Sequence, residues 1–246
     1  MPKYHIGGAL QVQVISDTHF FTHGREGILR IIDRQKGFST PVEQMDCASL
    51  TFMKATVARD SDGNAIFTPG NMDSINLYDR REGKSSQFLD RQPSKGMVMA
   101  MEGSINADCF VAYESGHVAL VDSRMHQIRR EFSLFSTPVI AFSANRELTQ
   151  FVAGTISDVL SVGSREGVES MKIPSEGILS LSYRCDSKLV ASGGKDRKVR
   201  VFDIRHKRPL AILSNHSKPV NVVLFTQDKY LISAGEDMNI FIWDIY

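Results

Sequence analysis

An apolar run that ends in aspartate or glycine recurs six times along this chain of 246 residues. A second run, rich in β-branched and aromatic residues, lies upstream of each one, as strands prefer. Short apolar runs at a regular spacing, with turn residues between them, predict strands rather than helices. The spacing is 40 to 46 residues, and the runs end at Asp33, Asp79, Asp122, Gly163, Asp203 and Asp244. We therefore expect an all-β fold built from six repeats.

The last repeat carries the most complete pattern. Its apolar runs are Val220–Phe225, Tyr230–Ala234 and Ile240–Asp244, and the third run ends in Trp243-Asp244. This pattern resembles the WD repeat, which has a period of about 40–45 residues and four strands in each propeller blade. The resemblance implies a WD40 β-propeller with six visible blades, forming a single domain over residues 1–246. The repeats are expected at approximately 5–45, 46–92, 93–133, 134–173, 174–212 and 213–246.

Composition narrows the function. The chain has 29 Lys and Arg against 28 Asp and Glu, a net charge of +1, which gives no overall field to attract nucleic acid. No apolar run approaches the roughly 18 residues that a membrane span needs, and the N-terminus lacks a signal-peptide core. The three cysteines are far apart and predict reduced thiols. We expect a cytoplasmic or nuclear protein without a cofactor, a metal, a membrane or direct nucleic-acid contact.

Four side chains of the last repeat can form one hydrogen-bonded network. His216 precedes the first strand, Ser233 is on the second, Asp237 follows it, and Trp243 is on the third. Asp237 and Ser233 can each bind one nitrogen of the imidazole, and Ser233 can accept the indole N–H, as burial requires. Ser, His and Asp also occur in hydrolases, but Ser233 lies in mid-strand without a G-x-S-x-G motif. We expect a structural tetrad and no enzyme.

The other blades are degenerate. In the first, Thr22 and Glu26 occupy the Ser and Asp positions, and His5 can supply the imidazole. In the fifth, Ser192 and Asp196 are kept, but no histidine precedes the first strand. The third blade has Val111, Ser115 and Val121 at the Ser, Asp and Trp positions, and the fourth has Ala153, Ser157 and Val162. We expect the degenerate blades to be held by apolar packing alone, because each repeat also packs against its neighbours.

Two runs end in Asp-x-Arg. They are Asp122-Ser123-Arg124 and Asp203-Ile204-Arg205. Both are similar to the W-D-x-R box of propellers that serve as substrate receptors of cullin–RING ubiquitin ligases, although both lack the tryptophan. Arg124 and Arg205 are the ligase-adaptor contacts in this alternative. An ordinary strand-end aspartate followed by a solvated arginine accounts for the same residues.

Stretches outside the repeat signature resemble the G-protein-beta-subunit-like protein 1 family, whose yeast relative is the ASTRA-associated protein. They include Ala191–Phe202, Arg208–Leu213 and the closing Ile242–Tyr246. Ala112–Val118 is similar to the A-G-Y-E-D-G-S-V stretch of that family. The family has a seven-blade architecture, so this chain is expected to lack the first blade. We then expect a gap or a strained closure between its first and last blades.

The family resemblance implies a non-catalytic co-chaperone adaptor. Its partners would be the TTT complex and kinases of the phosphatidylinositol-3-kinase-related class. No G-gamma subunit is expected, because no coiled-coil heptads precede the repeats. Mixed charge around the turns that follow the second strand of each blade suits a protein partner. This candidate binding set, the charged rim, consists of Arg25, Glu26, Asp73, Glu114, Asp158, Lys195, Asp196, Arg197 and Glu236.

Overall fold

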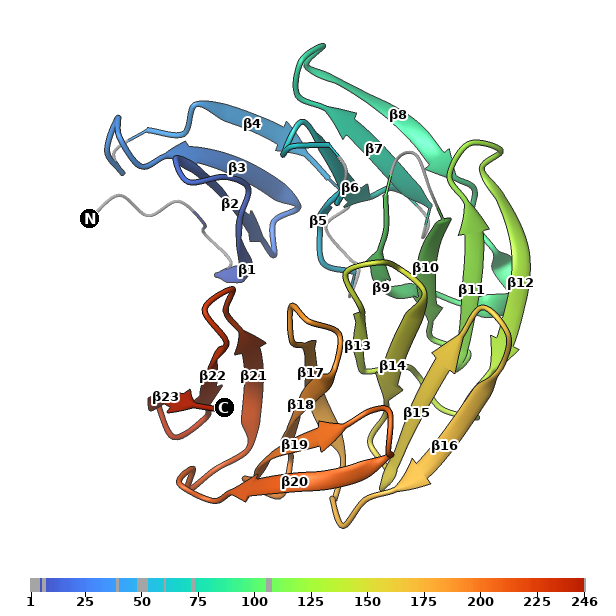
Figure 1. The fold of residues 1–246 in the computed structure, drawn as a ribbon. Coiled ribbons are helices and arrows are strands. Elements are labelled where there is room, and N and C mark those ends of the chain that lie inside the picture. The colour runs from blue at the N-terminus through green and yellow to red at the C-terminus, as the bar shows by residue number, and fades with distance from the viewer. Residues whose placement is uncertain are drawn as a thin grey trace. The chain divides into compact units, whose positions relative to one another are not determined.

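The computed structural model describes residues 5, 8–38, 40–47, 53–59, 61–71, 74–104 and 108–245. Asp73 of the charged rim lies outside these residues. The described chain is all-β, and its strands form six antiparallel sheets of the WD40 blade type (Figure 1). Two compact units divide the chain. One holds Met1–Tyr113 and Leu120–Arg130, and the other holds Glu114–Ala119 and Glu131–Tyr246.

Two sheets lie wholly in the first unit, and in each the strands follow chain order. The first sheet contains β1 (Ala9–Val14), β2 (His19–Gly24), β3 (Ile28–Asp33) and β4 (Glu43–Asp46). The second contains β5 (Thr56–Val57), β6 (Ala65–Pro69), β7 (Ile75–Asp79) and β8 (Lys84–Leu89). A short 3-10 helix at Pro93–Lys95 follows. The third sheet, within which the division between the units falls, contains β9 (Val98–Glu102), β10 (Asp108–Tyr113), β11 (His117–Asp122) and β12 (Gln127–Ser133).

The remaining three sheets lie in the second unit. The fourth contains β13 (Ala141–Ala144), β14 (Gln150–Gly154), β15 (Val159–Ser164) and β16 (Val168–Lys172). The fifth contains β17 (Ile178–Tyr183), β18 (Leu189–Gly194), β19 (Val199–Asp203) and β20 (Arg208–Leu213). The sixth contains β21 (Val220–Phe225), β22 (Tyr230–Gly235) and β23 (Ile240–Asp244). Among the described residues, this last sheet has three strands.

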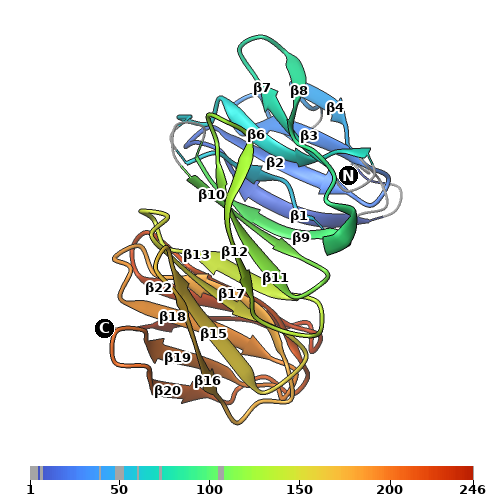
Figure 2. The same ribbon diagram turned by 90° about the vertical axis from the view of Figure 1, so that its right-hand side faces the viewer.

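The apolar core lies between neighbouring sheets. Ile178, Val190 and Phe202 of the fifth sheet are fully buried against Val152 and Leu160 of the fourth. Figure 2 shows these two sheets from the side of β15 and β16. The inner strands, such as β18, are buried along their whole length because a sheet covers each of their faces. Sheet-on-sheet packing of this kind is what makes a repeat depend on its neighbours.

Serine hydroxyls join the first strands of adjacent blades in the second unit. The amides of Val223 and Phe225 on β21 donate to Ser180 Oγ and Ser182 Oγ on β17, both at 3.0 Å. The amide of Tyr183 donates in turn to Ser143 Oγ on β13 at 3.2 Å. These bonds satisfy backbone groups that would otherwise be buried between the sheets without a partner.

The recurring strand-end aspartate has a local cause. Asp33, Asp79 and Asp122 each accept a hydrogen bond at 2.8 Å from the amide two residues ahead. Asp203 accepts one from the amide of His206 at 3.0 Å. A short carboxylate that binds its own turn favours the hairpin at that point. In these four blades, the 40-to-46-residue period therefore marks the turn after the third strand.

Gly163 departs from this pattern because of packing. A β-carbon on residue 163 would lie 2.1 Å from Cζ of the buried Phe151 ring. No side chain fits there, so a different residue stabilises the turn of the fourth blade. Ser164 Oγ accepts a hydrogen bond from the amide of Glu166 at 3.2 Å.

The predicted all-β WD40 fold with six blades is confirmed. Five third strands end at the predicted aspartate, and β15 ends at Ser164, one residue after Gly163. The single-domain organisation, the missing first blade and the incomplete closure stay predictions.

Candidate interaction site

The four polar and aromatic side chains of the last blade are brought together. His216 Nδ1 lies 3.0 Å from both carboxylate oxygens of Asp237, and His216 Nε2 lies 2.8 Å from Ser233 Oγ. The indole N–H of Trp243 donates to Ser233 Oγ at 2.9 Å. With a proton on Nδ1, the donors run in one direction, from Trp243 through Ser233 and His216 to Asp237. Every buried polar atom of this network then has a partner.

This network is structural in its geometry. Ser233 has no exposed surface, and its oxygen is engaged by both Trp243 and His216, so it offers no nucleophile to a substrate. Burial alone would raise the pKa of Asp237, but hydrogen bonds from the Ser217 amide and from His216 outweigh it. They hold the pKa well below its usual range and keep the carboxylate charged.

The first blade contains a related network. His5 Nδ1 lies 2.5 Å from Glu26 Oε1, and His5 Nε2 lies 2.8 Å from Thr22 Oγ1. Arg30 Nη1 also donates to Glu26 Oε1 at 3.0 Å. Burial would raise the pKa of Glu26, but hydrogen bonds from its own amide, His5 and Arg30 lower it to about 2.

The fifth blade replaces the histidine with an arginine. Arg200 on β19 is 1% exposed, and its guanidinium donates to Asp196 at 3.1 and 2.5 Å. It also donates to the carbonyl of Pro174, in the loop where the last blade has its histidine. The sequence pattern that reveals this residue is an arginine four positions after the turn acid, as in Glu26–Arg30 and Asp196–Arg200. The last blade has Phe241 at that position.

A glycine two residues before the turn acid makes room for each network. A β-carbon on Gly24 would lie 2.1 Å from His5 Nδ1, and one on Gly194 would lie 2.3 Å from Asp196 Oδ1. One on Gly235 would lie 2.8 Å from the carbonyl oxygen of Pro219 and 2.9 Å from His216 Nδ1. Any larger residue at these three positions would displace a polar group of the network or, at position 235, meet the Pro219 carbonyl.

The expectation that the degenerate blades are held by apolar packing alone is wrong for the first and fifth blades. Each has a charged network of its own, centred on Glu26 and on Asp196. In the first blade His5 and Arg30 both contact Glu26, and in the fifth Arg200 supplies the donors that a loop histidine supplies in the last blade.

The charged rim falls on turns in both units. Arg25, Asp158 and Glu236 are exposed, and Glu114 is half-buried. The carboxylates of Glu26 and Asp196 belong to the internal networks, which leaves them little freedom to bind a partner. Among the rim residues, Lys195, Asp196 and Arg197 share one cavity.

This cavity measures about 620 Å³ and lies between the β18–β19 turn and the loop before β17. Lys195, Arg197 and Lys198 are exposed cations without an ion-pair partner among the described residues. Glu176 also lines it. The backbone of Arg197 has a φ of 71°, a left-handed conformation that is unusual for a side chain of this size. The three exposed cations lie on the turn that also carries Asp196 of the Asp196–Arg200 ion pair, and they give this surface a positive charge.

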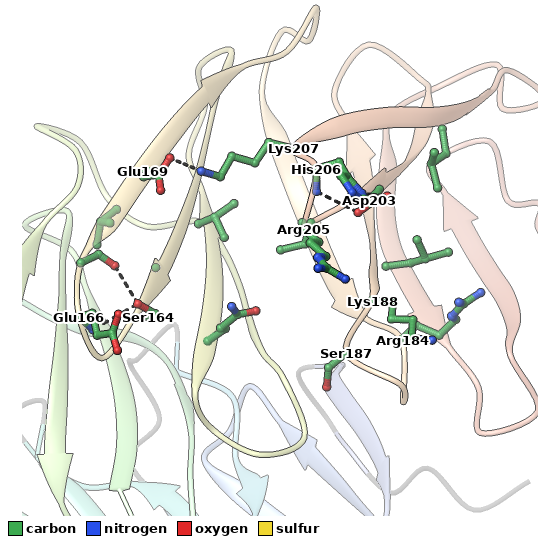
Figure 3. A pocket seen from close by; sticks show the side chains of 18 residues that line it. Ser164, Glu166, Glu169, Arg184, Ser187, Lys188, Asp203, Arg205, His206 and Lys207 are labelled. Atoms are coloured by element: carbon green, nitrogen blue, oxygen red, sulfur yellow. Dashed lines mark hydrogen bonds and ion pairs between the residues drawn. The ribbon is translucent and has the colours of Figure 1, made fainter.

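The two Asp-x-Arg arginines lie in separate turns. The Arg124 amide is bound by Asp122, and its side chain is exposed. Arg205 is also exposed, and it lines a larger cleft of about 970 Å³ between the fourth and fifth blades. Figure 3 shows Glu166 and Glu169 on one side of this cleft and Arg205 and Lys188 on the other. Sequence reasoning did not identify the cleft.

The repeats of this chain resemble those of known proteins. The model of the WD domain, G-beta repeat, matches residues 167–203 and 207–244. The chain contains WD40 repeats. Its WD40 pattern is strongest in the fifth and sixth blades, where the matched segments reach from β16 to β23.

This chain is similar to several known proteins along most or part of its length. It is 25% identical over 255 residues to guanine nucleotide-binding protein subunit beta-like protein 1 of Mus musculus, covering 97% of the chain and 78% of that protein. It is 28% identical over 236 residues to ASTRA-associated protein 1 of Schizosaccharomyces japonicus, covering 80% of the chain and 65% of that protein. A segment of 65 residues, 26% of the chain, is 46% identical to 13% of the U3 small nucleolar RNA-associated protein 15 homolog of Xenopus laevis.

These matches confirm the predicted resemblance to the beta-subunit-like and ASTRA-associated proteins over most of the chain. WD40 blades of this kind form scaffolds for protein–protein interaction and are typically non-enzymatic. Within the described residues, no group of three or more His, Cys, Asp and Glu is placed to hold a metal ion. None of the described helices is long and apolar enough to cross a membrane.

Proposed function

We propose that this chain is a co-chaperone adaptor of the TTT/ASTRA type, which supports maturation of phosphatidylinositol-3-kinase-related kinases. The observation that carries the proposal is the similarity to ASTRA-associated protein 1, which extends over 80% of the chain rather than over isolated repeats. A second protein of that name, from Schizosaccharomyces pombe, is 22% identical over 240 residues. An adaptor needs no catalytic group, which agrees with the full burial of Ser233.

The positively charged surface at Lys195, Arg197 and Lys198 is the proposed contact with the TTT complex. Its three cations are free to pair with acidic groups of a partner, and the underlying Arg200–Asp196 pair fixes the turn that carries them. Charge complementarity of this kind governs the association rate and the choice of partner more than the affinity itself. The contact should therefore weaken as the salt concentration rises.

The test is a charge reversal. Tagged wild-type chain and a Lys195→Glu/Arg197→Glu variant are used to capture the TTT complex from cell extract at low and moderate salt. Recovery should fall on the order of tenfold in the variant, as expected when two close charge pairs become repulsive. A Lys172→Glu/Lys218→Glu variant, which reverses two exposed cations of the same unit that do not line the cavity, should capture the complex normally. Equal recovery of the TTT complex by the two variants would contradict the proposed contact.

The alternative is a substrate receptor of a cullin–RING ubiquitin ligase. The feature in its favour is that Asp122 and Asp203 bind their own turn amides, which leaves Arg124 and Arg205 on exposed turns. Arg124→Ala and Arg205→Ala are tested in parallel for capture of a cullin adaptor. If they abolish such a contact while the Lys195→Glu/Arg197→Glu variant still recovers TTT normally, the ligase function replaces the co-chaperone function.

We also propose that the protein acts in the cytoplasm, the nucleus or both. The name of the Xenopus laevis relative, which refers to small nucleolar RNA, supports a nuclear pool. Imaging of a fluorescent fusion tests this proposal, and a fusion confined to another compartment would contradict it.

A further inference from the structure

The cleft between the fourth and fifth blades has acidic side chains on one wall and mainly basic side chains on the other, where the one carboxylate, Asp203, is paired with His206. Glu166 and Glu169 line the side formed by β15 and β16, and Lys188 and Arg205 line the side formed by the turns of the fifth blade (Figure 3). Glu169 pairs with Lys207, in the β19–β20 turn, and this ion pair bridges the two blades. Glu166, Lys188 and Arg205 are exposed and have no ion-pair partner among the described residues.

A buried donor also lines the cleft. The Arg184 side chain is 9% exposed, and its Nε and Nη2 donate to Asp186 at 3.0 and 2.7 Å. The remaining nitrogen, Nη1, is buried without a hydrogen-bond partner in the described part of the chain. A buried guanidinium N–H is costly to leave unpaired, so this wall favours a ligand that brings an acceptor oxygen.

Apolar side chains form part of the lining between the charged walls. Val162, Leu189, Ile204 and Leu210 contribute to it, and Leu210 is 49% exposed. The volume of about 970 Å³ is at the upper end of the range of small-molecule pockets, which is room for several residues of an extended peptide. A surface that combines apolar and charged side chains is typical of a site that binds protein rather than free ions.

We propose that this cleft binds an extended segment of a protein partner in which acidic and basic residues alternate. In an extended chain, successive side chains point to opposite sides. Acidic residues of the segment face Lys188, Arg205 and the free Arg184 nitrogen. Basic residues face Glu166 on the other wall. Phosphorylated segments and nucleic acid fit poorly, because their dense negative charge would meet Glu166 and Glu169.

This site is separate from the surface in the proposed function. The Lys195–Lys198 turn follows the C-terminal end of β18, whereas Lys188 directly precedes its first residue, Leu189. The two surfaces therefore lie at opposite ends of one strand. Loss of binding at one leaves the other intact, so the two proposals can fail independently.

The experiment is a peptide selection. A random peptide display library is selected on the intact wild-type chain, with prior depletion on a Lys188→Glu/Arg205→Glu variant. Enriched peptides are synthesised with a fluorescent label, and their Kd values are measured by anisotropy. We expect alternating acidic and basic positions, and a Kd on the order of tenfold weaker for the Lys188→Glu/Arg205→Glu variant. A Glu166→Lys variant should in turn prefer the same peptide with its basic residues replaced by acidic ones.

Three controls make the result decisive. The Lys172→Glu/Lys218→Glu variant and the Lys195→Glu/Arg197→Glu variant should bind the peptide like wild type, and all variants should share its Tm. Peptides without charge alternation would overturn the proposal. So would a best Kd above about 1 mM, or equal competition by an all-acidic peptide, a phosphopeptide or single-stranded RNA.

Discussion

Arg200 and Asp196 form a buried ion pair at the position where the last blade pairs His216 with Asp237. The arginine comes from the third strand of its blade, and the histidine comes from the loop before the first strand. Each donates to the carboxylate in the turn after the second strand of its own blade. Two different side chains therefore perform one structural role. The fifth blade should therefore depend on its acid as strongly as the last blade depends on Asp237.

Replacing Asp196 with alanine should destabilise the chain by about 3–5 kcal/mol, because it leaves a buried guanidinium without its counter-charge. A double variant, Asp196→Ala/Arg200→Leu, should recover much of this loss, since an apolar side chain needs no partner. Urea denaturation followed by circular dichroism measures both. A double variant no more stable than Asp196→Ala would show that the charge of Arg200 is not the source of the loss.

Replacing Ser233 with alanine should cost about 1–3 kcal/mol, because the Trp243 indole N–H and one His216 nitrogen lose their shared partner. Trp243 is the single tryptophan of the sequence, so its fluorescence reports the change directly. We expect a shifted emission maximum and a lower midpoint of denaturation. Ser214→Ala, at an exposed serine nearby, is the matched control and should leave both unchanged.

Acid should weaken the first blade through Glu26. Its pKa is about 2 in the folded chain, below the value of about 4.3 for an unfolded glutamate. The folded state therefore binds the proton less readily, and the stabilisation is present above the unfolded pKa and lost as the pH falls through the folded pKa.

Thermal melts of wild type and Glu26→Gln between pH 6 and pH 2 measure this contribution. Wild type should have the higher Tm at pH 6, and the difference should shrink steadily below about pH 4.3. Comparing the two proteins removes the parallel contribution of Asp237. A Tm difference independent of pH would contradict a role for the charge of Glu26.

Gly163→Ala should destabilise the fourth blade by about 1–3 kcal/mol, the usual cost of overpacking. The added carbon would lie 2.1 Å from the Phe151 ring, which is fully buried and has little room to move. The Gly163→Ala/Phe151→Leu double variant should lose less stability than the sum of the two single variants, because leucine is smaller and leaves room for the added carbon. Full additivity in denaturation experiments would argue against this contact.

The sequence predicts the hairpins because their signal is local. Asp79 binds an amide two residues ahead, so its effect does not depend on the rest of the fold. The tetrad of the last blade is similarly complete within one repeat. Arg200 was not anticipated, because a charged residue in a strand is ordinarily exposed and its burial depends on Asp196 and a carbonyl of a distant loop. The cleft joins Glu166 and Lys188 from different blades, a relationship that no single repeat contains.

The strand-end aspartates also make the residues that follow them in several turns replaceable. Each of Asp33, Asp79 and Asp122 fixes its hairpin through its own carboxylate, whichever side chains follow it. Foreign recognition loops could therefore be grafted after these residues without disturbing strand register. The turn after Gly163 has no such carboxylate, and a graft there would depend entirely on the packing around Phe151.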